Sequence, residues 1–550
     1  MTKLLLPLSI ILVVGLPFLL RDSDGGGFSA DDRVVIISPH NESIRHEFTR
    51  GFQEWYEEQT GRSVRIDWRV IGGTSEITRF LQSGYLNAFR NHWTQNLGRR
   101  WSMEVENAFA NPSLNPQPGQ PASGIAAEAR EAFLTSEIGV GVDLFFGGGS
   151  FDFIVQANAG NLLPSRILQT HPQWFVEEVI PSTFSGEPFY DKEGRWFGTA
   201  LSAFGIIFNR NALARVGFDD IPRQWEDLAA PRLFANVGLA DPSKSGSSNK
   251  AFEMILQQQM QLLEQELIAN GVSGDSLDKQ VREQGWLRGL GLIQRISANA
   301  RYFTDSASKP SIDVSQGDCA AGMSIDFFGR FQEETLRRRG GGDRFGYITP
   351  VGGSTVSVDP IGLLRGAPNR EVAERFIEFV LSPEGQSLWD LRVGTANGPR
   401  RYALRRQPVR REFYEEPLNS LRSDPEVLPY RDAESFVYRP EWTSHLFNPL
   451  RFIIKTAFID VHSDLVTAWG AIIEARNEGR DADADAAMEI FGDLSKVDFA
   501  NASGRIRDIL RDQNKLLEVH LTNEITRHFR QQYRLATKVA RGLGYELNSN

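Results

Sequence analysis

The sequence predicts an α/β fold with a mostly parallel sheet, because strand and helix patterns alternate along its first part. Val-Val-Ile-Ile at 34–37 is a short apolar run of the kind that a buried parallel strand needs. Apolar residues at helical spacing follow over 44–55, and apolar and charged residues then alternate over 64–70 as in a second strand. The turn at 72–76 leads into another helical pattern, and this βαβα order is typical of a sheet covered by helices.

Length and composition exclude several classes of protein. At ~100–200 residues per domain, 550 residues imply roughly three domains, or two large lobes with additions. The formal net charge of −10 argues against a nucleic-acid partner, because a phosphate backbone needs a basic face. Cys319 is the single cysteine, which excludes a disulfide framework within the chain and a cysteine-based zinc or iron–sulfur site. The eight histidines form no HExxH motif, so we expect no metal site and no cofactor.

The N-terminus has the pattern of a membrane segment. Residues 4–20 carry no charge and follow Lys3, and as a helix they would be about 26 Å long, enough for a bilayer core. The flank at 19–24 has no Ala-x-Ala-like cleavage site. We therefore predict an uncleaved anchor over 1–22, with a cleaved signal peptide as the alternative, and a flexible tether over 23–32. Either way the body lies on the periplasmic or extracellular face, tethered to the inner membrane or released.

Four predicted strands end in small, polar, glycine-rich loops, at 38–41, 72–75, 147–150 and 241–248. In open α/β sheets, ligands bind beyond the carboxyl ends of strands, where free N–H groups at helix N-termini favour anions or polar groups. Each loop alone would fit an ordinary tight connection. Four such loops in one chain favour a polar binding cleft.

Catalytic motifs are missing from the sequence. It contains no GxSxG elbow, no GxxxxGK[ST] phosphate loop and no GxGxxG after a strand. The acidic run at 481–485 lacks the sixth-position glycine and twelfth-position glutamate of a calcium loop, and it is interpreted as an acidic helix start. We therefore expect a protein that is not an enzyme. An exported hydrolase that uses Ser150 is the weakest rival.

The chain changes character at two places. Between 86 and 132 the pattern weakens, and the proline-rich stretch at 111–121 predicts a surface insertion. After about residue 401 long helical patterns dominate, and apolar residues over 446–472 step by three and four as in one amphipathic core helix. We expect residues 401–550 to be a helical extension, which either extends the core of one lobe, covers the back of the cleft or binds a partner.

An ordered set of motifs carries a resemblance to a known family. The motifs are Gly-Ile-Ile-Phe-Asn at 205–209, Trp-Glu-Asp-Leu at 225–228, Leu-Ala-Asp-Pro-Ser-Lys-Ser-Gly at 239–246, and the stretches at 359–368 and 373–386. Over roughly residues 33–400 the chain resembles the extracellular solute-binding proteins of ABC importers, in the type-2 periplasmic binding group that includes ferric-ion-binding proteins.

The resemblance implies two α/β lobes joined by crossing strands, with a ligand held between them by hinge closure. Lobe 1 would contain residues 33–200 with 350–400, and lobe 2 residues 201–349. The strand at 203–209 would be one hinge crossing, and the region at 358–364 another. The implied partners are a small-molecule solute and an ABC permease in the membrane, and we expect a monomer.

The chain departs from the ferric-ion-binding pattern at a decisive position. Proteins of that group typically hold iron through a tandem tyrosine, and here Phe327 and Phe328 occupy the matching stretch. A phenyl ring cannot ligate iron, and His40 with Asp326 would make a poor iron site. A small organic or oxyanionic solute fits better, with one of the two phenylalanines as an apolar wall, because strand alternation would turn only one of them inward.

The predicted ligand-binding residues follow from the strand-end loops and from this matching stretch. They are Ser38, His40, Asn41, Thr74, Ser75, Gly148, Ser150, Ser202, Ser245, Ser247, Asp326, Phe327 and Phe328. We expect an exported solute-binding protein that captures a small polar or anionic solute for an ABC transporter. The alternatives are a ligand-sensing receptor domain for a membrane signalling partner, with 401–550 as the interface, and an iron-binding protein with non-tyrosine ligands.

Overall fold

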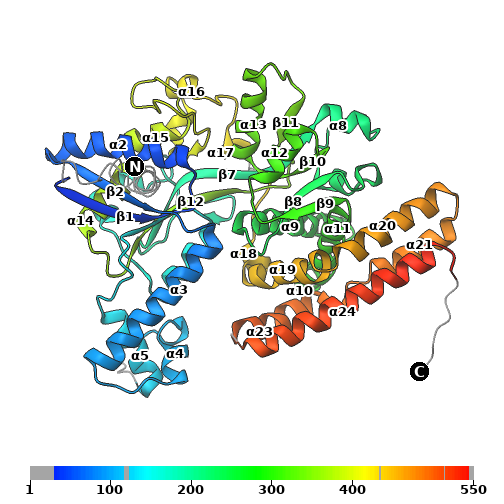
Figure 1. The fold of residues 1–550 in the computed structure, drawn as a ribbon, viewed down its shortest axis with the longest axis horizontal. Coiled ribbons are helices and arrows are strands. Elements are labelled where there is room, and N and C mark those ends of the chain that lie inside the picture. The colour runs from blue at the N-terminus through cyan, green and yellow to red at the C-terminus, as the bar shows by residue number, and fades with distance from the viewer. Residues whose placement is uncertain (1–29, 117–122, 433–434, 513, 544–550) are drawn as a thin grey trace, which may run out of the picture.

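The computed structural model describes residues 30–116, 123–432, 435–512 and 514–543 (Figure 1). The predicted anchor, and the predicted tether up to residue 29, lie outside the described residues, as does the stretch 117–122 of the proline-rich segment. Among the helices that the structure describes, none combines the length and the apolar content needed to cross a bilayer.

One sheet runs through the molecule in the strand order β2-β1-β3-β12-β7-β10-β8-β9. The strands are β1 (Asp32–Ile37), β2 (Val64–Arg69), β3 (Leu144–Phe146), β7 (Trp196–Asn209), β8 (Val237–Ala240), β9 (Ala300–Thr304), β10 (Ala321–Ile325) and β12 (Val356–Leu364). The outer strands pair in parallel, whereas β12 and β7 are antiparallel to their neighbours. The sheet is therefore mixed, because the strands that cross between the lobes run against the others.

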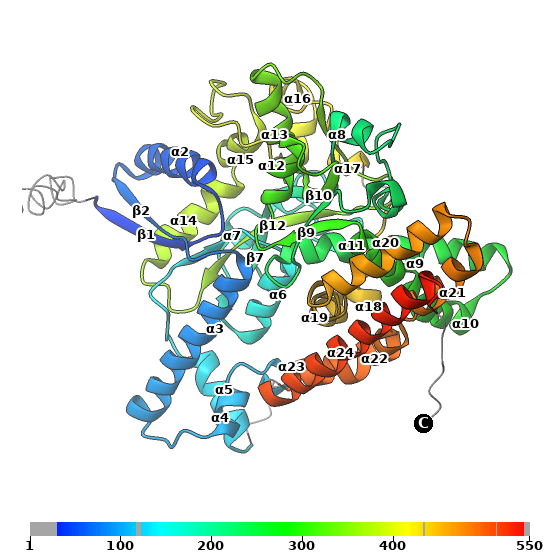
Figure 2. The same cartoon turned by 45° about the vertical axis from the view of Figure 1, so that its right-hand side comes forward.

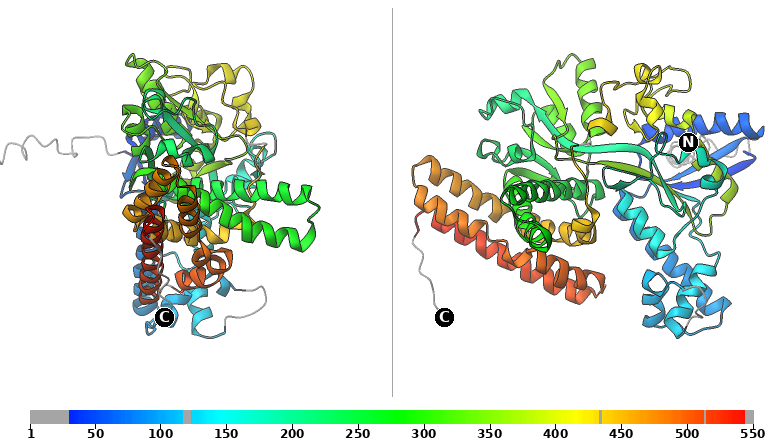
Figure 3. Two further views of the ribbon diagram at one scale, coloured as in Figure 1. Left: turned by 90° about the vertical axis from the view of Figure 1, so that its right-hand side faces the viewer. Right: turned by 180° about the vertical axis from the view of Figure 1, so that it is seen from behind.

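Strand β7 belongs to both lobes. Its first part pairs with β12 as far as Ala203, and its second part pairs with β10 and with β11 (Phe345–Ile348) from Phe204 onward. Figure 3 shows this long strand, seen from behind, running from one lobe into the other. The chain crosses back from the second lobe to the first in the segment between β11 and β12. The two-lobed α/β fold expected from the sequence is thus confirmed.

The helices cover both faces of each half of the sheet (Figure 1). On the first lobe lie α2 (Glu42–Thr60), α3 (Thr74–Asn91), α4 (Met103–Ala108), α5 (Ile125–Thr135), α6 (Ser150–Ala159), α7 (Ile167–Thr170), α14 (Arg370–Leu381) and α15 (Pro383–Asp390). On the second lie α8 (Arg210–Arg215), α9 (Gly246–Ala269), α10 (Gly274–Gln280), α11 (Trp286–Ala298), α12 (Lys309–Gln316) and α13 (Asp326–Arg338).

From residue 436 on, the C-terminal extension packs as part of the second lobe, whereas its Leu404 and Val409 belong to the core of the first lobe. Buried residues between 204 and 323 share one hydrophobic cluster with buried residues between 436 and 540, and a separate cluster joins 34–201 with 356–409. Of the three alternatives for the extension, this packing fits the one in which it extends the core of a lobe. Its helices are α16 (Leu418–Leu421), α17 (Pro429–Asp432), α18 (Pro440–Thr443), α19 (Phe447–Ile454), α20 (His462–Asn477), α21 (Asp481–Phe491), α22 (Phe499–Asn501), α23 (Arg507–Arg511) and α24 (Lys515–Ala540).

Two local expectations need correction. The pattern at 446–472 is not one helix, because a π-helical turn at Lys455–Ile459 separates α19 from α20. The weak pattern after residue 86 does not mark the end of regular structure. Helix α3 continues to Asn91, and α4 and α5 follow, so that this part forms an arm that projects from the first lobe (Figure 1). Long-range packing of Phe89, Phe109 and Phe133, with ring centroids 5.0–5.6 Å apart, builds the arm.

A third connection joins the lobes through the extension. The short hairpin of β5 (Thr183–Phe184) and β6 (Glu187–Pro188) packs on the first lobe, and Tyr438 of the extension donates a backbone hydrogen bond of 2.8 Å to the Ser185 carbonyl at its turn. Gly186 lies at the same turn with φ of +80°, and a Cβ there would be 1.7 Å from the Tyr438 carbonyl oxygen. Only glycine allows this close approach.

We predict that Gly186→Ala is strongly destabilising, because it adds a collision with the Tyr438 backbone to a left-handed conformation. Gly271→Ala is the matched control, since Gly271 has φ of +83° and a Cβ there would meet no atom within 4 Å. The control should cost about 1–3 kcal/mol, and Gly186→Ala at least about 2 kcal/mol more. Urea denaturation measures both, and equal losses would contradict the role of this contact.

Candidate functional site

A cavity of about 1110 Å³ lies between the lobes, and the first turns of six lobe helices line it together with the starts of α18 and α19 of the extension. Helices α2, α3 and α6 reach it from the first lobe, and α9, α12 and α13 reach it from the second. Each of these helices follows a strand end or a short loop. The cleft that the strand-end loops predicted therefore corresponds to one continuous cavity.

The structure brings most of the predicted site residues together around this cavity. Those that line it are His40, Asn41, Thr74, Gly148, Ser150, Ser202, Ser245, Ser247, Phe327 and Phe328. Ser38, Ser75 and Asp326 are buried but do not line it. The Ser38 hydroxyl accepts a hydrogen bond from the His40 backbone N–H at 3.1 Å, so its role is local. That the lining residues bind a solute stays a prediction.

Both phenylalanines of the tandem face the cavity, and the expectation that only one does is wrong. Phe327 and Phe328 lie in the first turn of α13, which begins at Asp326, so that strand alternation does not apply to them. Their ring centroids are 4.3 Å apart. Burial raises the pKa of the neighbouring Asp326 to about 6. In the described part of the chain no group of three or more histidine, cysteine or acidic residues could hold a metal ion.

The helix N-termini are a source of positive partial charge beside the cavity. The N-cap residues Gly73, Gly149, Ser308 and Ile325 make no side-chain cap to α3, α6, α12 and α13. Two N–H groups at these starts are already used, because Gly73 donates to the Glu76 carboxylate at 3.1 Å and Phe327 donates to the Asp326 carboxylate at 2.8 Å. First-turn N–H groups have no partner within their helix, and the helix dipole adds a partial positive charge at the same place. Such ends attract anions and polar oxygen atoms.

A buried charged group lies on the cavity wall at the crossing strands. Asp359 of β12 accepts a hydrogen bond from the Gly148 N–H at 2.6 Å, lies 2.9 Å from His40 Nε2 and forms an ion pair with Arg406. Arg406 also donates to the Ser202 hydroxyl at 2.9 Å. Burial by itself would raise the pKa of Asp359, but the charge of Arg406 and the contact with His40 lower it to about 2.

Two nitrogen atoms of this group are left without a partner. His40 Nδ1 and Arg406 Nε are buried, and among the described residues neither has a hydrogen-bond partner. Gly147 is needed for the arrangement, because it has φ of +101° and a Cβ there would lie 2.7 Å from His40 Nε2. Both side chains border the cavity. The two nitrogen atoms themselves lie buried behind the cavity wall.

Sequence reasoning missed Arg406, although the residue is central to the site. It lies beyond the range of the family resemblance, in the extension, just before the short strand β13 (Gln407–Pro408) that pairs with β7. Its guanidinium stacks over the Phe327 ring at 4.4 Å. The one signal in the sequence was Asp359, because a carboxylate inside an apolar strand requires a counter-charge from elsewhere.

A second charged cluster borders the cavity beside the extension. Lys250 Nζ lies 2.7 Å from Glu187 and 3.0 Å from Glu253, and 3.4 Å above the centre of the Tyr438 ring. The Tyr438 hydroxyl donates to Glu253 at 2.9 Å. Burial opposes the charge of Lys250, but both carboxylates raise the pKa of this amine overall. The cluster joins the hairpin of the first lobe to α9 of the second.

The lobes also meet beside α6 and α19, which face each other in Figure 2. The rings of Phe151 and Phe447 are 4.3 Å apart. Next to them, burial raises the pKa of Asp152 to about 6, although the charge of Arg451 acts in the opposite direction. Asp152 therefore carries an unfavourable charge at neutral pH at a contact between the lobes.

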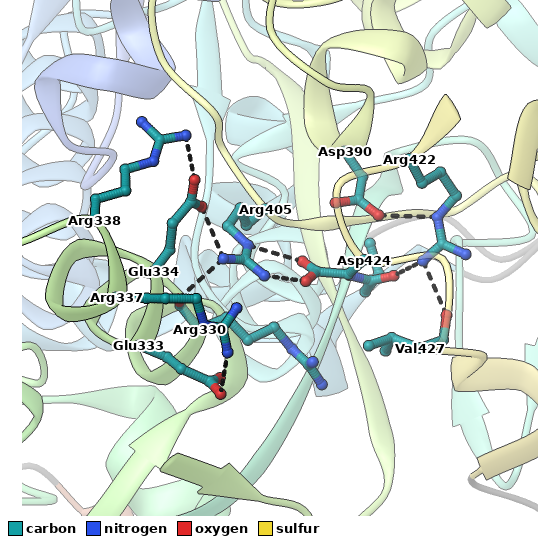
Figure 4. A network of polar contacts seen from close by, with 11 residues as sticks. Arg330, Glu333, Glu334, Arg337, Arg338, Asp390, Arg405, Arg422, Asp424 and Val427 are labelled. Atoms are coloured by element: carbon teal, nitrogen blue, oxygen red, sulfur yellow. Dashed lines mark hydrogen bonds and ion pairs between the residues drawn. The ribbon is translucent and has the colours of Figure 1, made fainter. Parts of the chain in front are cut away.

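Away from the cavity, an ion-pair network ties the extension to α13 (Figure 4). Arg405 donates to Glu334 of α13 at 2.7 Å and pairs with Asp424 through both ends of its guanidinium. Arg422 pairs with Asp390 at 2.9 Å, and both side chains are fully buried. Because α13 carries Phe327 and Phe328, this network holds the aromatic wall of the cavity in place.

The charged side chains that line the cavity include more carboxylates than cations, and several of the carboxylates are paired. The lining cations are Lys244, Lys250 and Arg406, and the lining anions are Asp152, Glu187, Glu253, Asp305 and Asp359. Arg406 pairs with Asp359, Lys250 is shared by two glutamates, and Arg451 stabilises the charge of Asp152 from behind the wall. Asp305 has no ion pair among the described residues, so a solute meets this carboxylate as well as the helix N-termini.

Residues 138–396 match the family of bacterial extracellular solute-binding proteins. The resemblance stated from the ordered motifs is thus confirmed over that range. An uncharacterized protein of Haemophilus influenzae is 24% identical over 246 residues, which are 45% of this chain and 60% of the relative. The phosphoglycerate transport regulatory protein PgtC of Salmonella typhimurium is 25% identical over 191 residues, which are 34% of this chain and 39% of the relative. The matches therefore span only part of these relatives.

Solved structures of periplasmic solute-binding proteins are also similar to this chain. The fructose-6-phosphate-bound protein AfuA of Actinobacillus pleuropneumoniae aligns with a TM-score of 0.46 at 16% identity, covering 74% of this chain and 94% of that one. Iron-bound HitA of Pseudomonas aeruginosa aligns with a TM-score of 0.45 at 13% identity, covering 76% and 98%.

We predict that Arg406→Met destabilises the protein by about 3–5 kcal/mol, because it leaves Asp359 buried without its main counter-charge. The double variant Arg406→Met with Asp359→Asn should recover most of this loss. Arg401→Met is the control, since Arg401 is exposed. Urea denaturation at pH 7 provides the free energies of unfolding, and a loss below about 1 kcal/mol in the single variant would refute the prediction.

We predict that Asp152→Asn stabilises the protein above pH 6 and has little effect below pH 4. The folded pKa of about 6 lies above the unfolded value near 3.9, so the carboxyl is protonated in both states at low pH and unfavourably charged in the folded state at high pH. The expected gain at pH 8 is about 3 kcal/mol. Thermal melts of both forms across pH 4–8 measure it, and a constant difference would contradict the assignment.

Proposed function

We propose that this protein is an exported solute-binding protein that holds a small anionic solute between its lobes and delivers it to an ABC permease. The observation that carries the proposal is the convergence of six helix N-termini, three from each lobe, on one cavity. Helix N-termini are suited to anions because their N–H donors and dipoles act together. The match of residues 138–396 to extracellular solute-binding proteins supports the same function.

The hydroxyl groups around the cavity fit this class of ligand. Thr74, Ser150, Ser245 and Ser247 stand at helix starts, where their hydroxyls and the adjacent N–H groups can share the oxygen atoms of one phosphate, phosphonate or carboxylate. The name of one relative, a phosphoglycerate transport regulatory protein, agrees with an anionic solute.

Binding is proposed to act through lobe closure, without catalysis. Strand β7 and the β11–β12 connection are the crossings about which the lobes can turn, and a ligand that touches both lobes stabilises the closed form. Ser150, which a hydrolase would use, has no histidine hydrogen-bonded to it among the described residues, and His40 Nε2 is held by Asp359. This arrangement favours capture over hydrolysis.

The remaining parts of the proposal come from the sequence. The protein is proposed to work as a monomer on the periplasmic or extracellular face, held by residues 4–20 or released by cleavage, with no nucleic-acid partner. Its predicted domains are the anchor at 1–22, the tether at 23–32, the two lobes and the extension at 401–550.

Sensing is the second candidate function, and one observation favours it: the similar protein PgtC is named a transport regulatory protein. A receptor would use the same cavity but present its occupied state to a signalling partner. Neighbouring genes distinguish the two, because permease and ATPase genes favour transport and kinase genes favour sensing.

We predict that anions stabilise the full chain in a thermal-shift screen, whereas polyamines and ferric citrate do not. The panel comprises inorganic phosphate, 3-phosphoglycerate, fructose 6-phosphate, phosphonates and carboxylates. A ligand at 100 times its Kd should add about 2.7 kcal/mol of stability. Ser150→Ala should weaken the effect, and Ser276→Ala, at an exposed position of α10, should not. Stabilisation by cations alone would overturn the proposed anionic solute.

A further inference from the structure

The C-terminal extension borders the solute cavity at two separate places in the sequence. Leu404 and Arg406 line it just after the region of family resemblance, and Tyr438, Ser444, His445 and Phe447 line it some 40 residues later. The extension packs with the core of the second lobe, but a purely structural addition has no need to reach the ligand cavity. Its position at the solute cavity therefore points to a role in ligand binding.

The later segment, residues 438–447, is fixed by polar contacts to α9. Asn249 donates to the Phe447 carbonyl at 2.8 Å, and Gln257 donates to the Arg439 carbonyl at 2.8 Å and to the Thr443 hydroxyl at 2.7 Å. Helix α9 itself starts at the cavity with Gly246. A wall held this way is organised before the solute arrives, so that ordering it costs little on binding.

Phe447, like Tyr438 at the β5–β6 hairpin, joins this wall to the first lobe. Its ring lies 4.3 Å from that of Phe151 at the start of α6. Phe327 and Phe328 border the same cavity from α13, again with rings 4.3 Å apart. Two aromatic pairs and a set of helix N-termini therefore share one cavity, which offers an apolar surface beside an anion-binding one.

The size of the cavity argues that a bare inorganic anion does not fill it. Its volume is about 1110 Å³, whereas one water molecule takes about 30 Å³ of the liquid. Pockets of several hundred Å³ and more are typical of organic ligands. A solute matched to this cavity has a body in addition to its charged group.

We propose that residues 438–447 are a specificity-determining wall of the binding site, and that this wall, through Phe447, selects organic anions with an apolar body over inorganic anions. The proposal rests on the proposed anion-binding function. The charged group of the solute lies at the helix N-termini, and its body packs against Phe447 and the other aromatic rings. The extension thereby decides which anion is captured.

The test compares ligand pairs that share a charged group and differ in their body. Titration calorimetry on the full chain uses phenyl phosphate against inorganic phosphate, and benzoate against acetate. At least one aromatic member should bind about tenfold more tightly than its small partner, since burial of an apolar ring adds affinity. Phe447→Ala should remove most of that difference and leave the affinity for the small anion within about twofold.

Two further variants separate binding from folding. Phe447→Leu keeps most of the apolar volume and should retain part of the preference, which covers the case in which Phe447→Ala does not fold. Phe452→Ala removes the same side chain from the next turn of α19, where it does not line the cavity, and should leave every affinity unchanged.

The outcomes are distinct. If small and aromatic anions bind equally, or if the preference survives in full in both Phe447 variants, the inference is overturned while the proposed anion-binding function stands. If no member of the screen or of these pairs binds, the proposed function fails, and the inference fails with it.

Discussion

The buried ion pair of Asp359 and Arg406 is the interaction on which the arrangement of the site depends. A carboxylate inside an apolar strand is tolerated only with a counter-charge and hydrogen bonds, and Arg406, His40 and the Gly148 N–H supply them. These partners come from the extension, from the loop after β1 and from the start of α6. Satisfying one buried charge therefore brings three distant segments to the crossing strands, where the cavity is formed.

The extension acts in the same way at a larger scale. It supplies Arg406 to the first lobe, adds the helices α19 to α24 to the core of the second, and ties α13 in place through Arg405 and Glu334. Its contact with the hairpin at Gly186 makes a third connection between the lobes. A protein with three connections must separate its lobes against more contacts than one with two crossings. In this protein the extension therefore fixes the geometry of the binding site together with the two lobes.

Local patterns predict much of the fold. The apolar run before Ser38, the alternation in β2 and the glycine-rich strand ends are all visible in the sequence, because strands and capped helix starts depend on residues close in sequence. The same patterns place the tandem Phe327–Phe328 in a strand, although the helix begins one residue earlier. The arm after residue 86 escapes them because its order comes from aromatic packing between α3, α4 and α5, which no local window reveals.

The sequence by itself determined the class of fold, the family resemblance, the polar loops and the tandem phenylalanine at 327–328. It could do so because each of these features depends on residues that lie close together in the sequence. Only the tertiary structure decided which charges meet: His40 lies 319 residues from Asp359, and Arg406 lies 47 residues from it. Such pairs form because a charge buried in the folded state needs a counter-charge nearby. Composition and spacing do not show which distant residue supplies it.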